Sequence, residues 1–195
     1  MPKTLLELSN RVPPIPRLAD ATLLLIDLQE EYRSGMLILD GIGAAIDRAA
    51  HLLERARAAG ARVVHVAHAG PPGALFDRTA GRGQIVAELA PRAGEPVVEK
   101  TLPCAFTRTN LAEVLDEGGR RPLVVVGAMT HMCASSTLRA AAELGYTSVV
   151  VADACATRDL PLPDGGIVPA AEVQRANLAA LGDRFARVVV GADLS

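Results

Sequence analysis

The sequence predicts an α/β domain, a three-layer sandwich of the Rossmann-like type built on a six-stranded, mostly parallel sheet. Short, continuously apolar segments recur along the chain, as expected for parallel strands covered on both faces. Segments with helical periodicity lie between them, which is the alternation of βαβ units. The six predicted strands are residues 22–27, 62–68, 96–100, 122–129, 147–154 and 187–190.

The chain begins with a segment that we expect to lie outside the domain. Pro13, Pro14 and Pro16 favour extended backbone and interrupt helices. Residues 1–20 are therefore predicted to form an N-terminal arm, lying on the domain or on a neighbouring subunit. The domain itself is predicted to cover residues 21–195.

The predicted helices follow the strands in order. Residues 42–59 carry an apolar stripe, and Gly60 follows as a left-handed cap. Asn110 and Glu113 have the spacing of a capping box for another helix. The other predicted helices are a short one at 84–90 and two longer ones at 133–144 and 169–181. Two loops rich in Gly and Pro, residues 69–83 and 161–166, are expected to set specificity.

Composition and charge exclude several classes of protein. The 195 residues carry a formal net charge of −2 and are 50% hydrophobic, which predicts a folded core. Without a basic patch, and with no Trp and few other aromatic residues, we expect no nucleic-acid partner. No apolar run approaches the roughly 20 residues that cross a bilayer, so we expect no membrane partner. Glu7 and Arg11 interrupt the apolar core that a secretory signal requires.

Three cysteines without a CxxC spacing predict neither a disulfide framework nor a zinc ribbon. We therefore expect a cytoplasmic protein with reduced thiols.

Polar residues stand at the carboxyl ends of the predicted strands, where an open parallel sheet binds its ligands. Asp27 ends the first strand, Lys100 the third, and Cys133 opens the helix after the fourth. A helix N-terminus and a nearby ammonium both stabilise a thiolate, the nucleophile of covalent acyl transfer. A carboxylate within reach can take the thiol proton and later activate water. The residues alone leave a second interpretation open, in which none of the three is catalytic. Asp27 would then be a turn residue, Lys100 a solvated strand end and Cys133 a small buried hydrophobe.

Three stretches resemble the isochorismatase-like cysteine hydrolase superfamily, which includes nicotinamidases, N-carbamoylsarcosine amidase and streptothricin hydrolase. They are LLLIDLQEEY around Asp27, VVEKTLPCAF around Lys100, and VVVGAMTHMCASSTLRAAAELGYTSVVVADACATRD from Val124 to Asp159. They occur in family order, and the resemblance runs from about residue 20 to 190. It implies the isochorismatase-like fold, with Cys133 as nucleophile and Asp27 as general base. Lys100 would hold both and favour their charged forms.

The resemblance also implies the backbone of the site and the course of the reaction. A cis peptide bond is implied between Ala128 and Met129, and the N–H groups of Met129 and Cys133 are implied to form the oxyanion hole. The thiolate would attack a carbonyl carbon, an amine or ammonia would leave, and water would release the acid from a thioester. No cofactor is implied.

Differences between this sequence and other members of the family narrow the range of reactions that we expect it to catalyse. Family members that cleave a vinyl ether lack the cysteine, so Cys133 argues against that chemistry. The Asp-x-His metal motif of nicotinamidases is missing, because Gly41 and Ile42 follow Asp40, and we predict no metal. The candidate pocket residues are Gln29, Tyr32, His68, Cys104, Phe106 and His131.

Two of the histidines raise questions of their own. His65 and His68 are three residues apart on one strand, so they should point to opposite faces. His131 raises a Cys–His dyad as a rival to the triad, although we expect it to face the pocket mouth or solvent.

The stretches around Cys133 resemble the streptothricin-hydrolase branch most, which predicts cleavage of a C–N bond in a small amide, lactam or ureido compound. A metal-dependent nicotinamidase or pyrazinamidase, and a catalytically silent oligomeric scaffold of the same fold, are the alternatives. Because family members usually assemble, we expect a homo-oligomer, either a dimer or a tetramer.

Overall fold

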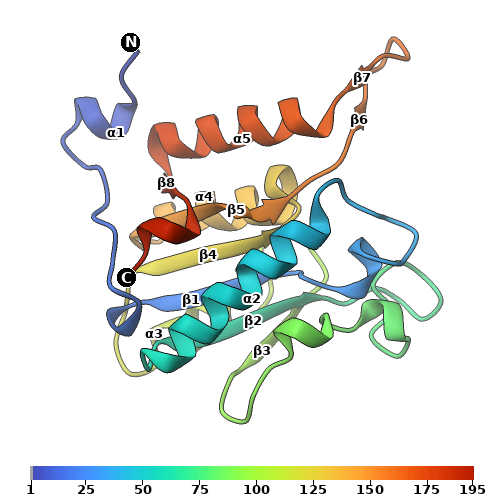
Figure 1. The fold of residues 1–195 in the computed structure, drawn as a ribbon, viewed down its shortest axis with the longest axis horizontal. Helices are drawn as coiled ribbons and strands as arrows, with labels where there is room; N and C mark the ends of the chain where they lie inside the picture. Colours follow the sequence, from blue (N-terminus) through green and yellow to red (C-terminus); the bar gives the residue numbers. More distant parts are fainter. Residues whose placement is uncertain (1) are drawn as a thin grey trace.

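A six-stranded sheet in the order β3-β2-β1-β4-β5-β8 forms the middle layer, and its strands are all parallel (Figure 1). The computed structural model describes residues 2–195. The strands are β1 (Thr22–Ile26), β2 (Arg62–His68), β3 (Val97–Lys100), β4 (Leu123–Ala128), β5 (Ser148–Ala156) and β8 (Arg187–Val189). The predicted fold class is confirmed, and the predicted strand boundaries agree within two residues.

Burial explains why the central strands have apolar runs without alternation. Every residue of β1 and β4 is buried, since helices cover both faces of the sheet. Leu23 and Leu25 of β1 belong to one core cluster, whereas Leu24 and Ile26 belong to another on the opposite face. The edge strand β3 alternates between exposed and buried residues instead.

The helices form the two outer layers. The long helix α2 (Ile42–Ala58) crosses one face and packs into the first core cluster (Figure 1). The opposite face is covered by α3 (Leu111–Asp116), α4 (Ser135–Glu143) and α5 (Ala170–Arg184), whose apolar residues belong to the second cluster. Within residues 2–195, none of the helices has the length and apolar character that a membrane crossing needs.

The predicted arm contains a helix that the prolines did not predict. Met1 lies outside the described residues. In α1 (Leu5–Leu8), Thr4 and Glu7 form a reciprocal capping box, in which the Glu7 N–H donates to Thr4 Oγ1 (3.1 Å). The Leu5 N–H donates to Asp183 Oδ1 of α5 (2.9 Å), so the arm lies on its own domain.

Three other local predictions differ from the structure. Asn110 makes no capping bond at α3; the Leu111 N–H donates to Thr109 Oγ1 instead (3.2 Å). The predicted helix at 84–90 is only a 3₁₀ turn, Ala87–Leu89. The strands β6 (Leu160–Pro161) and β7 (Ile167–Val168) form a short antiparallel hairpin around the predicted loop, and the hairpin projects from the sheet (Figure 1).

The strand order locates the site. From β1 the chain builds outward through β2 to β3, and from β4 it builds outward in the other direction through β5 to β8. The connections therefore diverge between the neighbours β1 and β4, and ligands of open α/β sheets bind in the crevice beyond such a switch point.

Candidate active site

Three buried side chains meet beyond the carboxyl ends of β1, β3 and β4. Asp27 follows β1, Lys100 ends β3, and Cys133 lies in the turn after β4. The Lys100 Nζ lies 2.6 Å from Asp27 Oδ2 and 3.4 Å from Cys133 Sγ. None of the three residues is more than 4% exposed. The structure therefore brings the three predicted catalytic residues together, away from bulk water.

Lys100 reaches the other two residues across a strand. β2 lies between β3 and β1, and two strand spacings amount to about 10 Å. A long, unbranched side chain can cover most of that distance, whereas a short one would end beneath β2. A lysine at the end of β3 is thus suited to tie the edge of the sheet to its centre.

Asp27 has unusual backbone geometry. Its φ of +51° lies in the left-handed region, which aspartate enters more readily than most residues. Its N–H donates to the Val66 carbonyl at 3.0 Å, which fixes the turn against β2. Residues held in such conformations cluster at functional sites.

A π-helical turn, Thr130–Ala134, carries Cys133. In this turn the Ala134 N–H donates to the Met129 carbonyl at 3.2 Å. The turn runs directly into α4, whose α-helical residues begin at Ser135, two residues after the predicted helix start at Cys133. The bond between Ala128 and Met129 is cis. The assignment of the Met129 and Cys133 N–H groups to an oxyanion hole stays a prediction.

Burial decides the charge state of the thiol. It raises the pKa of Cys133 to about 12, with a further increase from the Asp27 carboxylate and a smaller opposing effect from Lys100. Burial also raises the pKa of Asp27, again against the attraction of the Lys100 ammonium. Lys100 does favour the charged forms, but burial outweighs it. The resting site therefore holds a thiol beside a carboxylate with raised proton affinity.

His68, at the end of β2, completes the set of Lys100 contacts. Its Nδ1 lies 3.1 Å from the Lys100 Nζ, and its ring is half-buried. On the opposite face His65 lies 3.1 Å from Glu95, so the two histidines diverge as their spacing predicts. Within residues 2–195, no group of three or more His, Cys, Asp or Glu side chains has a metal-binding arrangement.

Gln29 and Tyr32 lie close to the site but are both buried. The Gln29 amide bonds the main chain of His68 in both directions, at 2.8 and 2.9 Å, and donates to the Gly83 carbonyl at 2.7 Å. The prediction that Gln29 lines the pocket is wrong, because backbone groups occupy its side chain. For Tyr32, burial and then the charges of Asp27 and Cys133 hold the pKa well above its usual value.

The remaining candidates lie farther from the triad contacts. His131 Nδ1 is 2.6 Å from Thr157 Oγ1, which gives this ring a partner other than the thiol. Phe106 is partly buried against the second core cluster and stacks on Tyr146, which precedes β5; its role in the pocket stays a prediction. Cys104 is half-buried and free.

Phe76 is an aromatic residue that the sequence analysis missed. Its ring packs edge-on against Tyr32, with 5.0 Å between centroids, and lies 5.1 Å from the ring of His68. Its φ is +60°, which is rare for a bulky residue. The one available signal was that Phe76 is the single aromatic residue in the predicted specificity loop, residues 69–83.

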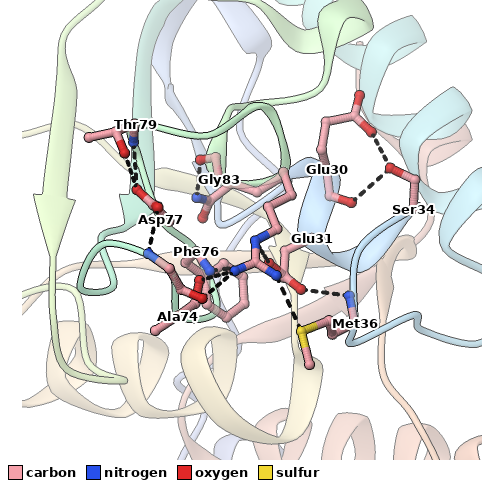
Figure 2. A network of polar contacts seen from close by, with 12 residues as sticks. Glu30, Glu31, Ser34, Met36, Ala74, Phe76, Asp77, Thr79 and Gly83 are labelled. Carbon is pink, nitrogen blue, oxygen red and sulfur yellow. Dashed lines mark hydrogen bonds and ion pairs between the residues drawn. The ribbon is translucent and has the colours of Figure 1, made fainter.

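A buried carboxylate anchors this loop. Figure 2 shows Glu31 between the two segments: its Oε1 accepts the Met36 N–H at 2.7 Å, and its Oε2 accepts the Phe76 N–H at 3.3 Å. Arg82 lies 3.6 Å from Oε2 and donates to the Ala74 carbonyl at 2.8 Å. Glu31 thus holds the backbone of the residue that packs against Tyr32 and His68.

Asp77 fixes the loop from within. Its Oδ2 accepts the Gly73 N–H at 2.7 Å, and its Oδ1 accepts both the N–H and the hydroxyl of Thr79 (Figure 2). These bonds lower the pKa of Asp77 to about 2. Gly83 allows the close return of the chain, because a Cβ there would lie 2.0 Å from the Asp77 carbonyl oxygen. The loop is therefore built to one conformation.

Comparison with known proteins places this arrangement among isochorismatase-like enzymes. The family model for the isochorismatase domain matches residues 21–193. A secreted isochorismatase effector of Verticillium dahliae is 40% identical over 90% of each chain. A streptothricin hydrolase of Streptomyces noursei is 40% identical over 83% of this chain and 59% of its own length. A crystal structure of an isochorismatase from Pseudomonas putida KT2440 superposes with a TM-score of 0.96, at 42% identity and over all of both chains. Because the Verticillium relative is secreted, a cytoplasmic location stays a prediction.

Proposed function

Because the chain belongs to the isochorismatase family and is a hydrolase of C–N bonds other than peptide bonds, we propose that Cys133 is its nucleophile. The substrate would be a small amide, lactam or ureido compound. One observation carries the proposal: Lys100 Nζ lies within 2.6 Å of Asp27 and 3.4 Å of Cys133 at the switch point of the sheet. A catalytically silent scaffold would not require this buried arrangement.

The first half-reaction forms a thioester. Asp27 takes the Cys133 proton as Sγ attacks the carbonyl carbon, because burial leaves almost no free thiolate at rest. The substrate oxygen becomes an oxyanion, for which the Met129 and Cys133 N–H groups are the proposed donors, worth about 3–4 kcal/mol each. Asp27 then gives the proton to the departing nitrogen, and the C–N bond breaks.

The second half-reaction reverses the proton movements. Asp27 takes a proton from water as the water oxygen attacks the thioester. The C–S bond breaks, the thiol regains its proton from Asp27, and the acid leaves. Lys100 keeps its proton throughout, so its positive charge stabilises the negative charge as it moves between Sγ and the carboxylate.

In this proposal, the residues around the triad determine which substrate the enzyme accepts. The 69–83 loop holds the Phe76 ring 5.1 Å from the ring of His68, which supports a role for this loop in specificity. The streptothricin hydrolase relative supports a small-molecule C–N substrate over a protein one.

A homo-oligomer, either a dimer or a tetramer, is also proposed. Met36 and Ile38 are 77% and 62% exposed, and neighbouring exposed apolar side chains are typical of interfaces. Light scattering coupled to size exclusion gives the molar mass, and a monomer at micromolar concentration would contradict this part of the proposal.

The reaction is tested by trapping the thioester. Purified protein is incubated with a panel of small amides, lactams and ureido compounds while amine or ammonia release and the intact protein mass are followed. We expect turnover with at least one class and an acyl adduct that maps to Cys133. Cys133→Ala should abolish both, whereas Cys104→Ala, at a half-buried cysteine outside the triad contacts, should keep them.

Asp27→Asn tests the proton transfers. It should remove turnover, because Asn accepts hydrogen bonds but takes no proton at neutral pH. Circular dichroism of the variant checks that it is folded, since the change leaves the buried Lys100 without its charge partner. Turnover retained in Cys133→Ala or in Asp27→Asn would overturn the mechanism.

A further inference from the structure

His68 is fixed in place more completely than its position outside the triad requires. Its main-chain N–H and carbonyl are both bonded by the buried amide of Gln29, at 2.8 and 2.9 Å. Its ring packs against Phe76, whose own N–H is held by the Glu31 carboxylate. Two separate segments therefore hold His68, one at its main chain and one at its ring.

The Lys100 contact determines which ring nitrogen carries the proton. An ammonium has only donors, so the His68 Nδ1 at 3.1 Å must accept. The other two contacts of the Lys100 ammonium are a hydrogen bond to Cys133 Sγ and the ion pair with Asp27 Oδ2. Burial and the Lys100 charge lower the pKa of His68 to about 4, so the ring is neutral at neutral pH. Its one proton then sits on Nε2.

The Nε2–H group is available to a ligand. Within residues 2–195 this nitrogen makes no hydrogen bond, and the ring is only half-buried. A neutral ring with its proton fixed on Nε2 can donate a hydrogen bond there but cannot accept one. The group lies on the ring that contacts Lys100, whose own neighbours are Cys133 and Asp27.

We propose that His68 is a specificity-determining residue that donates its Nε2–H to a lone-pair acceptor on the substrate, next to the scissile C–N bond. The inference rests on the proposed hydrolase function and adds a substrate requirement to it. The substrate carries a carbonyl, ether, ring-nitrogen or carboxylate acceptor at that position. A substrate with an ammonium or N–H donor there is rejected, because donor would face donor and the Lys100 charge lies directly behind the ring.

The proton position is tested first, by nitrogen NMR of the full-length protein labelled with ¹⁵N-histidine. The chain has four histidines, and the His68 signals are those missing from His68→Gln. We expect an unprotonated Nδ1 and a protonated Nε2, unchanged between pH 5.5 and 8. A proton on Nδ1, or a titration near the usual histidine pKa of about 6.5, would overturn the inference.

The donor role is tested through alkylation of Cys133 by two small reagents. Iodoacetamide carries a carbonyl acceptor, whereas allyl bromide carries none. His68→Phe keeps the aromatic packing on Phe76 but has no donor, whereas His68→Gln keeps an N–H donor. We expect His68→Phe to slow iodoacetamide about three- to tenfold, the effect of one hydrogen bond, and to leave allyl bromide within about twofold. His68→Gln should restore most of the iodoacetamide rate.

The matched control is His51→Phe, at an exposed position on α2, which should change neither rate. Equal slowing of both reagents in His68→Phe would mean that the ring only shapes access, and would refute the donor role. Equal rates in His68→Phe and His68→Gln would refute it as well. Neither measurement needs turnover, so both are decided separately from the proposed hydrolysis.

Discussion

Replacing Lys100 by methionine tests the buried ion pair directly. The change keeps the long stem but removes the charge that lies 2.6 Å from Asp27 Oδ2. At that separation, with an effective dielectric constant of about 20, the attraction is roughly 6 kcal/mol before desolvation costs are subtracted. Removing one partner of a buried pair typically costs about 3–5 kcal/mol, because the other charge is left buried and unpaired. We therefore expect Lys100→Met to lower the free energy of unfolding by about 3–5 kcal/mol at pH 8.

The loss of unfolding free energy in Lys100→Met should change with pH in a direction that can be worked out from the pKa of Asp27. Burial already raises the pKa of Asp27 in the folded protein, so folding favours its protonated form. Stability contributed by such a group is complete below its unfolded pKa, about 3.9, and is lost as the pH rises through its folded pKa. Removal of Lys100 raises the folded pKa further. The gap between Lys100→Met and the parent should therefore be small near pH 4.5 and grow toward pH 8.

Urea unfolding followed by circular dichroism, at half-unit steps from pH 4.5 to 8, measures this gap. The double variant Asp27→Asn, Lys100→Met removes both charges and should recover most of the lost stability at pH 8. A gap that does not depend on pH, or a double variant no more stable than Lys100→Met, would refute the reasoning.

Three more predictions concern the thiol and the loop. Alkylation of Cys133 by iodoacetamide should rise about tenfold per pH unit up to at least pH 9, because its pKa is raised to about 12; a plateau at lower pH, read by peptide mass, would contradict this. Gly83→Ala should lower the free energy of unfolding by about 1–3 kcal/mol, since its Cβ would meet a backbone oxygen at 2.0 Å. Gly81→Ala, with nothing within 4 Å, is the matched control, and equal urea midpoints would refute the clash. Glu31→Gln should cost about 1–3 kcal/mol, because it leaves a buried N–H or Arg82 unpaired, whereas Glu99→Gln on the exposed Arg78 pair should change the urea midpoint little.

The sequence predicted the sheet and the positions of the three central side chains for a simple reason. Apolar runs identify buried parallel strands, and the carboxyl ends of such strands share one edge. Asp27 and Lys100 follow or end two of these runs, so topology places both at one edge of the sheet, and the family resemblance identifies them as a pair. The structure adds that the backbone of Asp27 is in the left-handed region and that the side chain of Lys100 reaches across β2.

Other features depended on contacts that no local pattern encodes. Phe76 packs against His68 in a loop whose backbone is bonded at the Phe76 N–H by Glu31, 45 positions earlier. Gln29 looked like a pocket residue by its place after Asp27, yet its amide is occupied by backbone from β2 and from Gly83. The thiol was expected to be ionised because a lysine was near, but burial outweighs that lysine.

In the proposed mechanism, the origin of Lys100 on β3 makes the reaction depend on an edge strand of the sheet. β3 has four residues and pairs with a single neighbour, β2. Edge segments of this kind open in local fluctuations that cost far less than global unfolding. Each such opening would withdraw the ammonium from Asp27 and Cys133 while the remaining five strands stay paired. On heating, activity should therefore be lost at a lower temperature than the global unfolding transition. The amide hydrogens of β3 should exchange with solvent at the rate at which activity is lost.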